Sequence, residues 1–387
     1  MTTLAQTRRL SLGDRLRQGA LGLDWVLLVT AVAISSFGLW VVKEATRDDI
    51  TGDPGYFYFR QLVYLFAGLA LMVLAAGVDL ERIARRPWAL WGALCAAVAF
   101  VLAVGTTARG STRWIDLGPF RLQPSELGKL VLCVALAGIV VQHRDEIGSK
   151  RLSLMLTGAT AVPAAVVFLQ PDLGTSIVYF VILGAVLLVA GVPWTHFAAF
   201  AAVVAVGALL VLWVLPAAGT PVLRDYQVER LTAFATSDRG STASYQLDQS
   251  KIAAGQGGAL GKGVDGATQT RNDFLPEHHT DFIFSVVAEM FGFVGAAGLI
   301  LAFGVLIWRG LRILARASTQ LDQLVAGAIV SMLAFEVFVN IGMTVGIMPI
   351  TGIPLPFMSY GGSHTLTNLV AVGLLLGIHR RRAPGPV

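Results

Sequence analysis

The chain is poor in charged residues and nearly free of cysteine. Only 14% of its 387 residues are charged, whereas soluble domains carry about a quarter. Together with a hydrophobic content of 55%, this scarcity excludes an ordinary soluble enzyme and indicates a polytopic membrane protein. The two cysteines, Cys95 and Cys133, lie in apolar segments. They support neither a disulfide framework nor a metal site.

Two further signals are missing. The net charge of +5 is not gathered into a basic stripe interleaved with aromatics, so nucleic acid is excluded as a predicted partner. The basic N-terminus leads into an apolar run that is too long for a signal peptide and has no small-residue cleavage site. This run is therefore predicted to be a first membrane span.

Ten segments are apolar and long enough to cross a bilayer, which takes about 20 residues. The predicted fold is an all-α polytopic membrane protein, one domain over residues 1–387. It has about ten transmembrane helices and a long extracytoplasmic loop, 216–281, between spans seven and eight. The predicted spans lie near 23–42, 60–77, 88–105, 125–142, 153–170, 174–191, 195–215, 282–308, 321–346 and 364–379.

The distribution of Lys and Arg predicts the orientation. Most basic residues of the short connections fall on the same side as the N-terminus, including the clusters at 82–86, 309–316 and 380–382. By the positive-inside rule, both termini are predicted to be cytoplasmic and the 216–281 loop to lie outside.

The long loop ends in a run of polar residues, Leu275 to Asp281, and the chain then enters the bilayer. A carboxylate at a membrane boundary beside two histidines stabilises a membrane protein poorly. It suits chemistry on a lipid-linked substrate, so Asp281 is the candidate catalytic residue. Asp273, Glu277 and His279 are predicted to bind substrate.

The fourth span opens with a pair of opposite charges, Glu126 and Lys129, which are i,i+3 neighbours. They form either a structural ion pair or the charged wall of an outward cavity in which Lys129 faces an anionic substrate. The preceding outer loop holds Arg109, Arg113 and Trp114. Trp114 fits an interfacial belt, whereas three cations near one boundary favour phosphate binding.

Two turns between spans and one glycine-rich run are further candidates for functional segments. Asp172 fits a helix N-cap as well as a site residue. Residues 346–363 hold three prolines and four glycines, which predicts irregular backbone lining a wet cavity or a simple re-entrant turn. There Ser363 and neighbouring amides are candidates to bind an anion. The run 255–263 lacks the pattern of a nucleotide P-loop and is interpreted as a loop over the site.

These residues resemble the SEDS family (shape, elongation, division and sporulation) over essentially all ten spans. The resemblance rests on several motifs together, and residues 266–269 before 274–277 are most similar to the elongation branch, RodA, rather than the division branch, FtsW. The chain departs from the family at Met290, His364 and Ser111–Thr112. The motifs are Tyr245-Gln246 with Gln249-Ser250, Gly261-Lys262-Gly263, 275–284, 354–363, 123–127 and 170–175.

The resemblance implies a peptidoglycan glycosyltransferase in the bacterial cytoplasmic membrane that polymerises lipid II. It places the essential aspartate at Asp281 and also points to Arg113, Trp114, Glu126 and Lys129. A class B penicillin-binding protein is the implied partner, because the chain carries no Ser-x-x-Lys transpeptidase motif in an outer domain.

The expected mechanism is an inverting transfer that releases undecaprenyl pyrophosphate, with Asp281 as the general base. Lys129, Arg109 and Arg113 would stabilise the leaving group. No resident cofactor is predicted, and a divalent cation, magnesium or manganese, is left open at the pyrophosphate. The alternatives are a lipid II flippase, for which no internal repeat is found, and a membrane scaffold.

Overall fold

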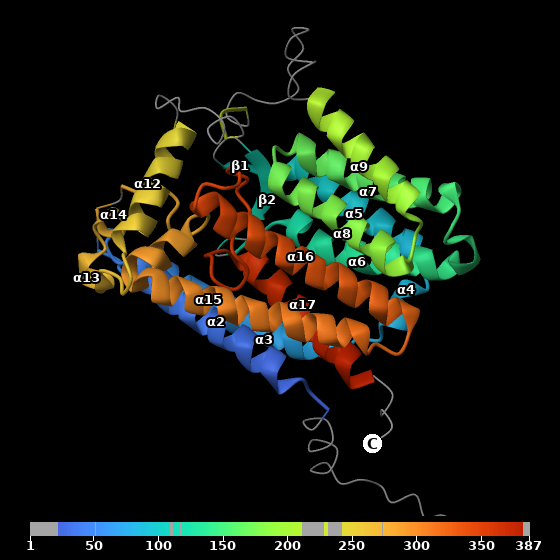
Figure 1. The fold of residues 1–387 in the computed structure, drawn as a ribbon, viewed down its shortest axis with the longest axis horizontal. Coiled ribbons are helices and arrows are strands. Elements are labelled where there is room, and N and C mark those ends of the chain that lie inside the picture. Colours follow the sequence, from blue (N-terminus) through green and yellow to red (C-terminus); the bar gives the residue numbers. More distant parts are fainter. Residues whose placement is uncertain are drawn as a thin grey trace, which may run out of the picture.

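A computed structural model of the chain describes residues 22–50, 52–108, 111–116, 118, 120–210, 228–230, 242–272 and 274–381. It is a bundle of long helices (Figure 1). The long helices are α2 (Trp25–Ala45), α3 (Tyr56–Ala76), α5 (Pro87–Val104), α6 (Pro124–Gln142), α7 (Lys150–Leu169), α8 (Leu173–Ala190), α9 (Trp194–Leu209), α15 (Ile283–Ala315), α16 (Gln320–Thr344) and α17 (Gly362–Arg381).

Each of the ten predicted spans falls on one of these helices, which confirms the all-α polytopic class. Seven of them are long and apolar enough to cross a membrane on length and composition, and Pro87–Ala103 and Trp194–Gly207 are shorter apolar helices. The tenth, α17, is less apolar, and the polar residues of its first two turns are buried in the protein. Which face is cytoplasmic stays a prediction from the charge distribution.

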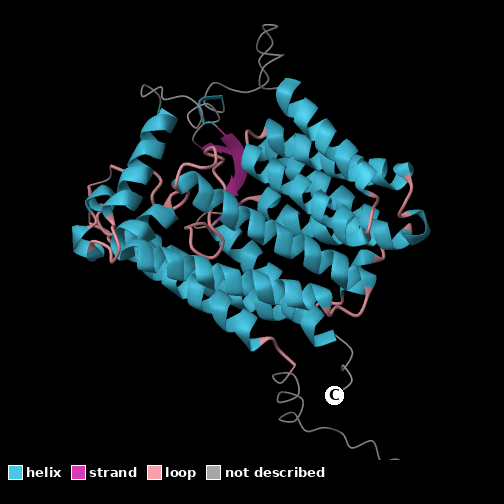
Figure 2. Ribbon diagram, in the orientation of Figure 1, coloured by secondary structure: helices cyan, strands magenta, loops and turns pink. Residues whose placement is uncertain are grey.

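The prediction missed a small antiparallel sheet of order β1-β2-β3 in the loop before α6. Its strands are β1 (Thr106–Ala108), β2 (Ser111–Asp116) and β3 (Arg121–Leu122). Figure 2 shows these strands, in magenta, as an exception in a helical molecule. The remaining short elements are α4 (Leu80–Ala84), the 3-10 turn Arg144–Glu146, α12 (Thr242–Gln256), α13 (Gly263–Gly266) and α14 (Thr268–Arg271).

The centre of the bundle is formed by α6, α16 and α17. The apolar window of α6 is 83% buried and that of α16 is 72% buried, against 33% for α3. Helix α17 packs against α3, and α16 packs against α8 and α15. Side chains on these central helices are therefore shielded from lipid, and polar groups there can pair with one another.

Helix α15 is broken at Gly292, whose φ of 66° is left-handed. The glycine-rich run fills this break: Lys262 N–H donates to the Glu289 carbonyl at 2.9 Å, and Phe293 N–H donates to the Gly258 carbonyl at 2.8 Å. A Cβ at Gly292 would overlap the backbone at Gly261. The run is thus a backbone plug in α15, which corrects its interpretation as a loop over the site.

The end of the bundle that holds the start of α2 is closed by a buried ion pair. Arg309 Nη2 lies 2.6 Å from Asp24 Oδ2, and Asp24 also caps α2 by accepting from Leu27 N–H. Burial alone would raise the pKa of Asp24, but the hydrogen bonds from Arg309 and Leu27 and the nearby positive charges hold it below its usual value of 3.8. The charged pair therefore stabilises the fold above that pH, and this contribution is lost as the pH falls below it.

We expect Asp24→Asn to destabilise the protein by about 3 kcal/mol, because Arg309 would keep its buried charge without a partner. Thermal unfolding of the purified protein in detergent at neutral pH measures this. The control is Asp145→Asn, which removes an ion pair with Arg144 whose side chains are 96% and 74% exposed. It should change stability by less than about 1 kcal/mol. Equal shifts in both variants would contradict a special role for Asp24.

Candidate active site

Asp281 lies in a tight turn directly before α15. The turn is built on Glu277, whose φ of 57° is left-handed. The Glu277 carbonyl accepts hydrogen bonds from the amides of Thr280, Asp281 and Phe282, and its carboxylate accepts from Thr280 Oγ1 at 3.0 Å. A non-glycine residue in this conformation is strained unless its surroundings hold it. Glu277 therefore shapes the turn that presents Asp281.

Side chains from α16 and from the 346–361 segment hold this turn in place. Asn340 on α16 donates one amide to the Asp281 carbonyl at 2.9 Å and to the Ile353 carbonyl at 2.8 Å. Ser359 Oγ donates to the Thr280 carbonyl at 2.6 Å and accepts from Leu355 N–H. Two polar backbone groups of the irregular 346–361 segment, the Ile353 carbonyl and the Leu355 amide, are thus bound by side chains, as membrane depth requires.

His279 completes the contacts of the turn. Its carbonyl accepts from Tyr360 N–H at 2.9 Å, and its ring lies 4.6 Å from that of Phe57 and 5.7 Å from that of Tyr360. Burial and the nearby Tyr64 raise the pKa of Tyr360 to about 12, so it remains a neutral phenol. The predicted substrate residue His279 is thus held in an aromatic box beside Asp281.

One arginine, Arg230, approaches Asp281, and a second, Arg113, lies in a pocket with Arg230. A Cβ placed on Gly352 would lie 3.0 Å from Arg230 Nη1 and 3.6 Å from Asp281 Oδ2, so both groups border the same point. Arg113 on β2 shares a narrow pocket of about 20 Å³ with Arg230, Asp172 and Thr351. A carboxylate beside Arg230, which in turn shares a pocket with Arg113, is an arrangement that can both accept a proton and bind phosphate oxygens.

Arg113 is oriented by its neighbours. Its Nη1 lies 3.6 Å from Asp172 Oδ1, and its guanidinium lies 4.7 Å from the Trp114 ring. Asp172 is the N-cap of α8, accepts from Thr175 N–H and also accepts from Gln123 Nε2 at 2.8 Å. Asp172 is therefore a helix cap, and it also positions the Arg113 side chain.

Lys129 lies in a buried ion cluster. Its Nζ is 2.7 Å from Glu126 Oε2 and 2.6 Å from Glu336 Oε1, and the Lys129 side chain is 2% exposed. His364 Nδ1 lies 3.2 Å from the same Glu126 oxygen. The geometry therefore favours the structural ion pair over the charged wall of a cavity. Lys129 joins α6 to α16, and it is not among the residues that line the pocket with Arg113 and Arg230.

Ser363, predicted to bind an anion, is occupied by backbone partners. Its hydroxyl accepts from Gln123 N–H at 2.8 Å and donates to the Arg121 carbonyl at 3.1 Å. It thereby ties the start of α17 to β3 and α6. Two predicted site residues, Arg109 and Asp273, lie outside the described residues.

Asn340, Ser359 and Arg230 are structural contributors that sequence reasoning did not place in the site. Asn340 carried a signal, because an amide four residues after Glu336 on an apolar helix must find partners in the interior. Ser359 lay unremarked among the prolines and glycines of an irregular segment. Arg230 lay in the middle of the long loop, where no pattern distinguished it from solvated arginines.

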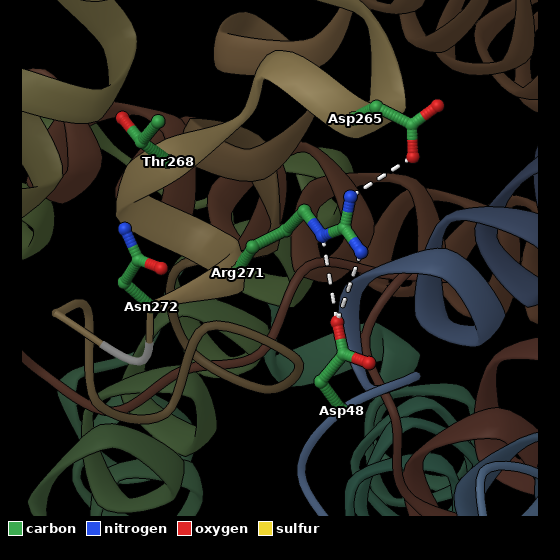
Figure 3. A pocket seen from close by; sticks show the side chains of 5 residues that line it. All are labelled: Asp48, Asp265, Thr268, Arg271 and Asn272. Carbon is green, nitrogen blue, oxygen red and sulfur yellow. Dashed lines mark hydrogen bonds and ion pairs between the residues drawn. The ribbon is translucent and has the colours of Figure 1, made fainter.

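A larger pocket of about 330 Å³ lies nearby and is lined by Asp48, Asp265, Thr268, Arg271 and Asn272. Figure 3 shows Arg271 reaching between two carboxylates. Its Nη1 lies 2.9 Å from Asp265 and its Nη2 lies 3.4 Å from Asp48. The pair with Asp48 attaches α14 to the loop between α2 and α3, and the pair with Asp265 attaches it to α13.

Comparison with known sequences covers the whole helical bundle. The chain matches the family model FTSW_RODA_SPOVE, described as cell cycle protein, over residues 22–383. Peptidoglycan glycosyltransferase MrdB of Escherichia coli strain K12 is 36% identical over 370 residues, 93% of this chain and 94% of that protein. Stage V sporulation protein E of Bacillus subtilis is 34% identical over 92% of this chain and 97% of that protein.

Solved structures agree with these relatives. The Thermus thermophilus Rod shape determining protein RodA is 30% identical and superposes with a TM-score of 0.66, over 94% of this chain and 98% of that one. A chain from a peptidoglycan synthase complex, described as coordinating polymerization and crosslinking, superposes with a TM-score of 0.77 at 31% identity. That match covers 93% of this chain and 98% of that one.

We expect Lys129→Met to lower the thermal unfolding midpoint in detergent strongly, because two buried carboxylates would lose their shared cation. A loss of about 3–5 kcal/mol is typical when one partner of a buried pair is removed. The triple variant Glu126→Gln, Lys129→Met, Glu336→Gln removes all three charges and should recover much of that stability. If Lys129→Met unfolds like the unmodified protein, the ion-cluster role is wrong.

Proposed function

The chain belongs to the FtsW, RodA and SpoVE family and is a peptidoglycan glycosyltransferase, and we propose that it polymerises lipid II into glycan strands at the outer face of the cytoplasmic membrane during cell elongation. The observation that carries this proposal is the position of Asp281. Its carboxylate stands at the end of the long loop, on a turn held by α16 and the 346–361 segment, and near the Arg230 side chain.

In the proposed reaction, Asp281 accepts the proton of the acceptor sugar hydroxyl as its oxygen attacks the anomeric carbon of the donor. The bond to the lipid pyrophosphate breaks, and the configuration at that carbon inverts. A general base in this role contributes about 10²–10⁴-fold in rate. The hydroxyl oxygen becomes the new glycosidic oxygen, and undecaprenyl pyrophosphate leaves with both bonding electrons.

The leaving pyrophosphate gains negative charge, and we assign its stabilisation to Arg113 and Arg230. Guanidinium groups pair with phosphate oxygens in a bidentate manner and remain charged at every relevant pH. Arg109 belongs to the same predicted cation group. Lys129 takes a different part: from within the ion cluster it fixes α6 against α16, on which Asn340 holds the Asp281 turn.

The proposed partner is a class B penicillin-binding protein that crosslinks the strands. The similarity to a chain of a synthase complex that couples polymerization to crosslinking supports it.

We expect Asp281→Asn to lose polymerisation of labelled lipid II by at least about 100-fold, because the amide cannot accept the proton. The variant should keep its unfolding midpoint and its binding of lipid II. Asp265→Asn, a substitution in the same loop at a side chain 86% exposed, is the control and should polymerise normally. Glycan product on a gel at a near wild-type rate with Asp281→Asn would refute the assignment. A liposome flipping assay, run in parallel, tests the flippase alternative.

We expect Asn340→Ala to lower kcat at least about tenfold while the KM for lipid II changes little, because the Asp281 turn loses its anchor and small misplacements of reacting groups cost rate. The matched control is Gln323→Ala on the same helix, whose amide also donates to a backbone carbonyl, that of Ala317. A kcat unchanged in Asn340→Ala, or lowered equally in Gln323→Ala, would show that Asn340 does not position Asp281.

A further inference from the structure

Three metal-ligating side chains meet where the loop between α2 and α3 touches the Asp281 turn. Asp49 comes from that loop, and His278 and His279 come from the turn. Asp49 Oδ2 lies 3.4 Å from His278 Nε2 and 3.8 Å from His279 Nδ1, and one ligand atom from each of the three lies within 4.8 Å of the others. We propose that they form a binding site for a divalent transition-metal ion, best matched by zinc.

The hydrogen bonding of His278 prepares its ring as a ligand. Its Nδ1 lies 2.9 Å from the Leu275 carbonyl oxygen, which can only accept, so Nδ1 carries the proton. In the neutral ring the lone pair is then on Nε2, the atom that faces Asp49. A ligating histidine typically donates its other N–H to a carbonyl or carboxylate, which fixes the tautomer and the ring orientation.

The distances also fit a shared ion. A charge-assisted hydrogen bond between an imidazolium and a carboxylate would measure about 2.7–2.9 Å, shorter than the 3.4 Å between His278 and Asp49. Ligand atoms around a tetrahedral zinc ion, with bonds of about 2.0–2.1 Å, stand about 3.3 Å apart. The 3.4 Å between His278 and Asp49 is close to that spacing, and His279 Nδ1, 3.8 Å from Asp49, would move slightly closer to share the ion.

The three side chains are held in place before any ion binds. His278 is 2% exposed and Asp49 is 18% exposed. Phe57 and Tyr360 pack on the His279 ring. Asp48, next to Asp49, pairs instead with Arg271 (Figure 3), so its carboxylate has a partner outside this cluster. A site whose ligands are already positioned loses little entropy when the metal binds.

The donor atoms favour a transition-metal ion over magnesium or calcium. Two imidazole nitrogens and one carboxylate oxygen suit zinc, and bind manganese more weakly, whereas magnesium and calcium prefer oxygen ligands alone. Three protein ligands leave a fourth position open to water or to a substrate oxygen. Bound there, the ion would join the α2–α3 loop to the Asp281 turn, through His279, which lies two residues before Asp281. This inference does not rest on the proposed polymerisation.

The test uses the full-length protein in detergent, without a polyhistidine tag and stripped with a chelator that is then removed. Isothermal titration calorimetry with zinc chloride should show one tight site per chain. Asp49→Asn and His278→Gln should each weaken it at least about 100-fold. The matched control Asp48→Asn changes the neighbouring carboxylate and should bind zinc normally. Magnesium chloride should give no comparable heat.

Cobalt provides a readout that depends on no variant. Cobalt(II) added to the stripped wild-type protein should produce the visible absorption bands of a four-coordinate ion, and zinc should abolish them. Asp281→Asn should bind zinc as the wild type does even when it makes no polymer, so the two proposals fail separately. The proposal is overturned if the wild type binds no stoichiometric zinc, or if Asp49→Asn, His278→Gln and Asp48→Asn bind it alike. Either result would leave the histidines as ion-pair partners of Asp49.

Discussion

The side-chain amide of Asn340 is the interaction on which the site depends. It bonds the Asp281 and Ile353 carbonyls, which belong to two non-helical segments that meet inside the bundle. An unsatisfied carbonyl shielded from water costs several kcal/mol, so neither segment could lie there alone. Ser359 links the same two segments, because its hydroxyl donates to the Thr280 carbonyl and accepts from the Leu355 amide. The two segments satisfy each other through side chains, and the rigidity of α16 is passed to the Asp281 turn.

Charge is divided between two places with different physical purposes. Glu126, Lys129 and Glu336 are almost fully buried and bind one another, which leaves them no freedom to follow a substrate. Arg113 and Arg230 border a pocket, and Asp281 lies near Arg230 at Gly352, so a ligand can reach these charges. A buried pair is costly to break and adds little when intact. Here the ion cluster fixes how α6 and α16 are aligned along their lengths, because Lys129 on α6 bonds Glu336 on α16.

The sequence was informative wherever a property is local. Runs of apolar residues located all ten long helices, and the candidate Asp281 was chosen from its position between the long loop and an apolar run. Partners distant in the chain were not recognisable. Lys129 finds Glu336 across 207 positions, and Arg113 finds Asp172, because helix packing brings them together and no local pattern encodes that packing. The glycine-rich run was misread for the same reason, since its purpose depends on a break in α15 that follows it in the chain.

His364, predicted to depart from the family pattern, belongs to the buried ion cluster. Asn368 Nδ2 lies 3.0 Å from His364 Nε2, and an amide nitrogen can only donate, so Nε2 accepts and Nδ1 carries the proton that faces Glu126. The ring bridges Asn368 and Glu126. It supplies a hydrogen bond to a cluster that holds two carboxylates and a single lysine, and a buried carboxylate without such donors is costly. The imidazole is therefore engaged by Glu126 and Asn368 inside the bundle. The geometry of the Asp281 turn is set by Asn340, Ser359 and Glu277.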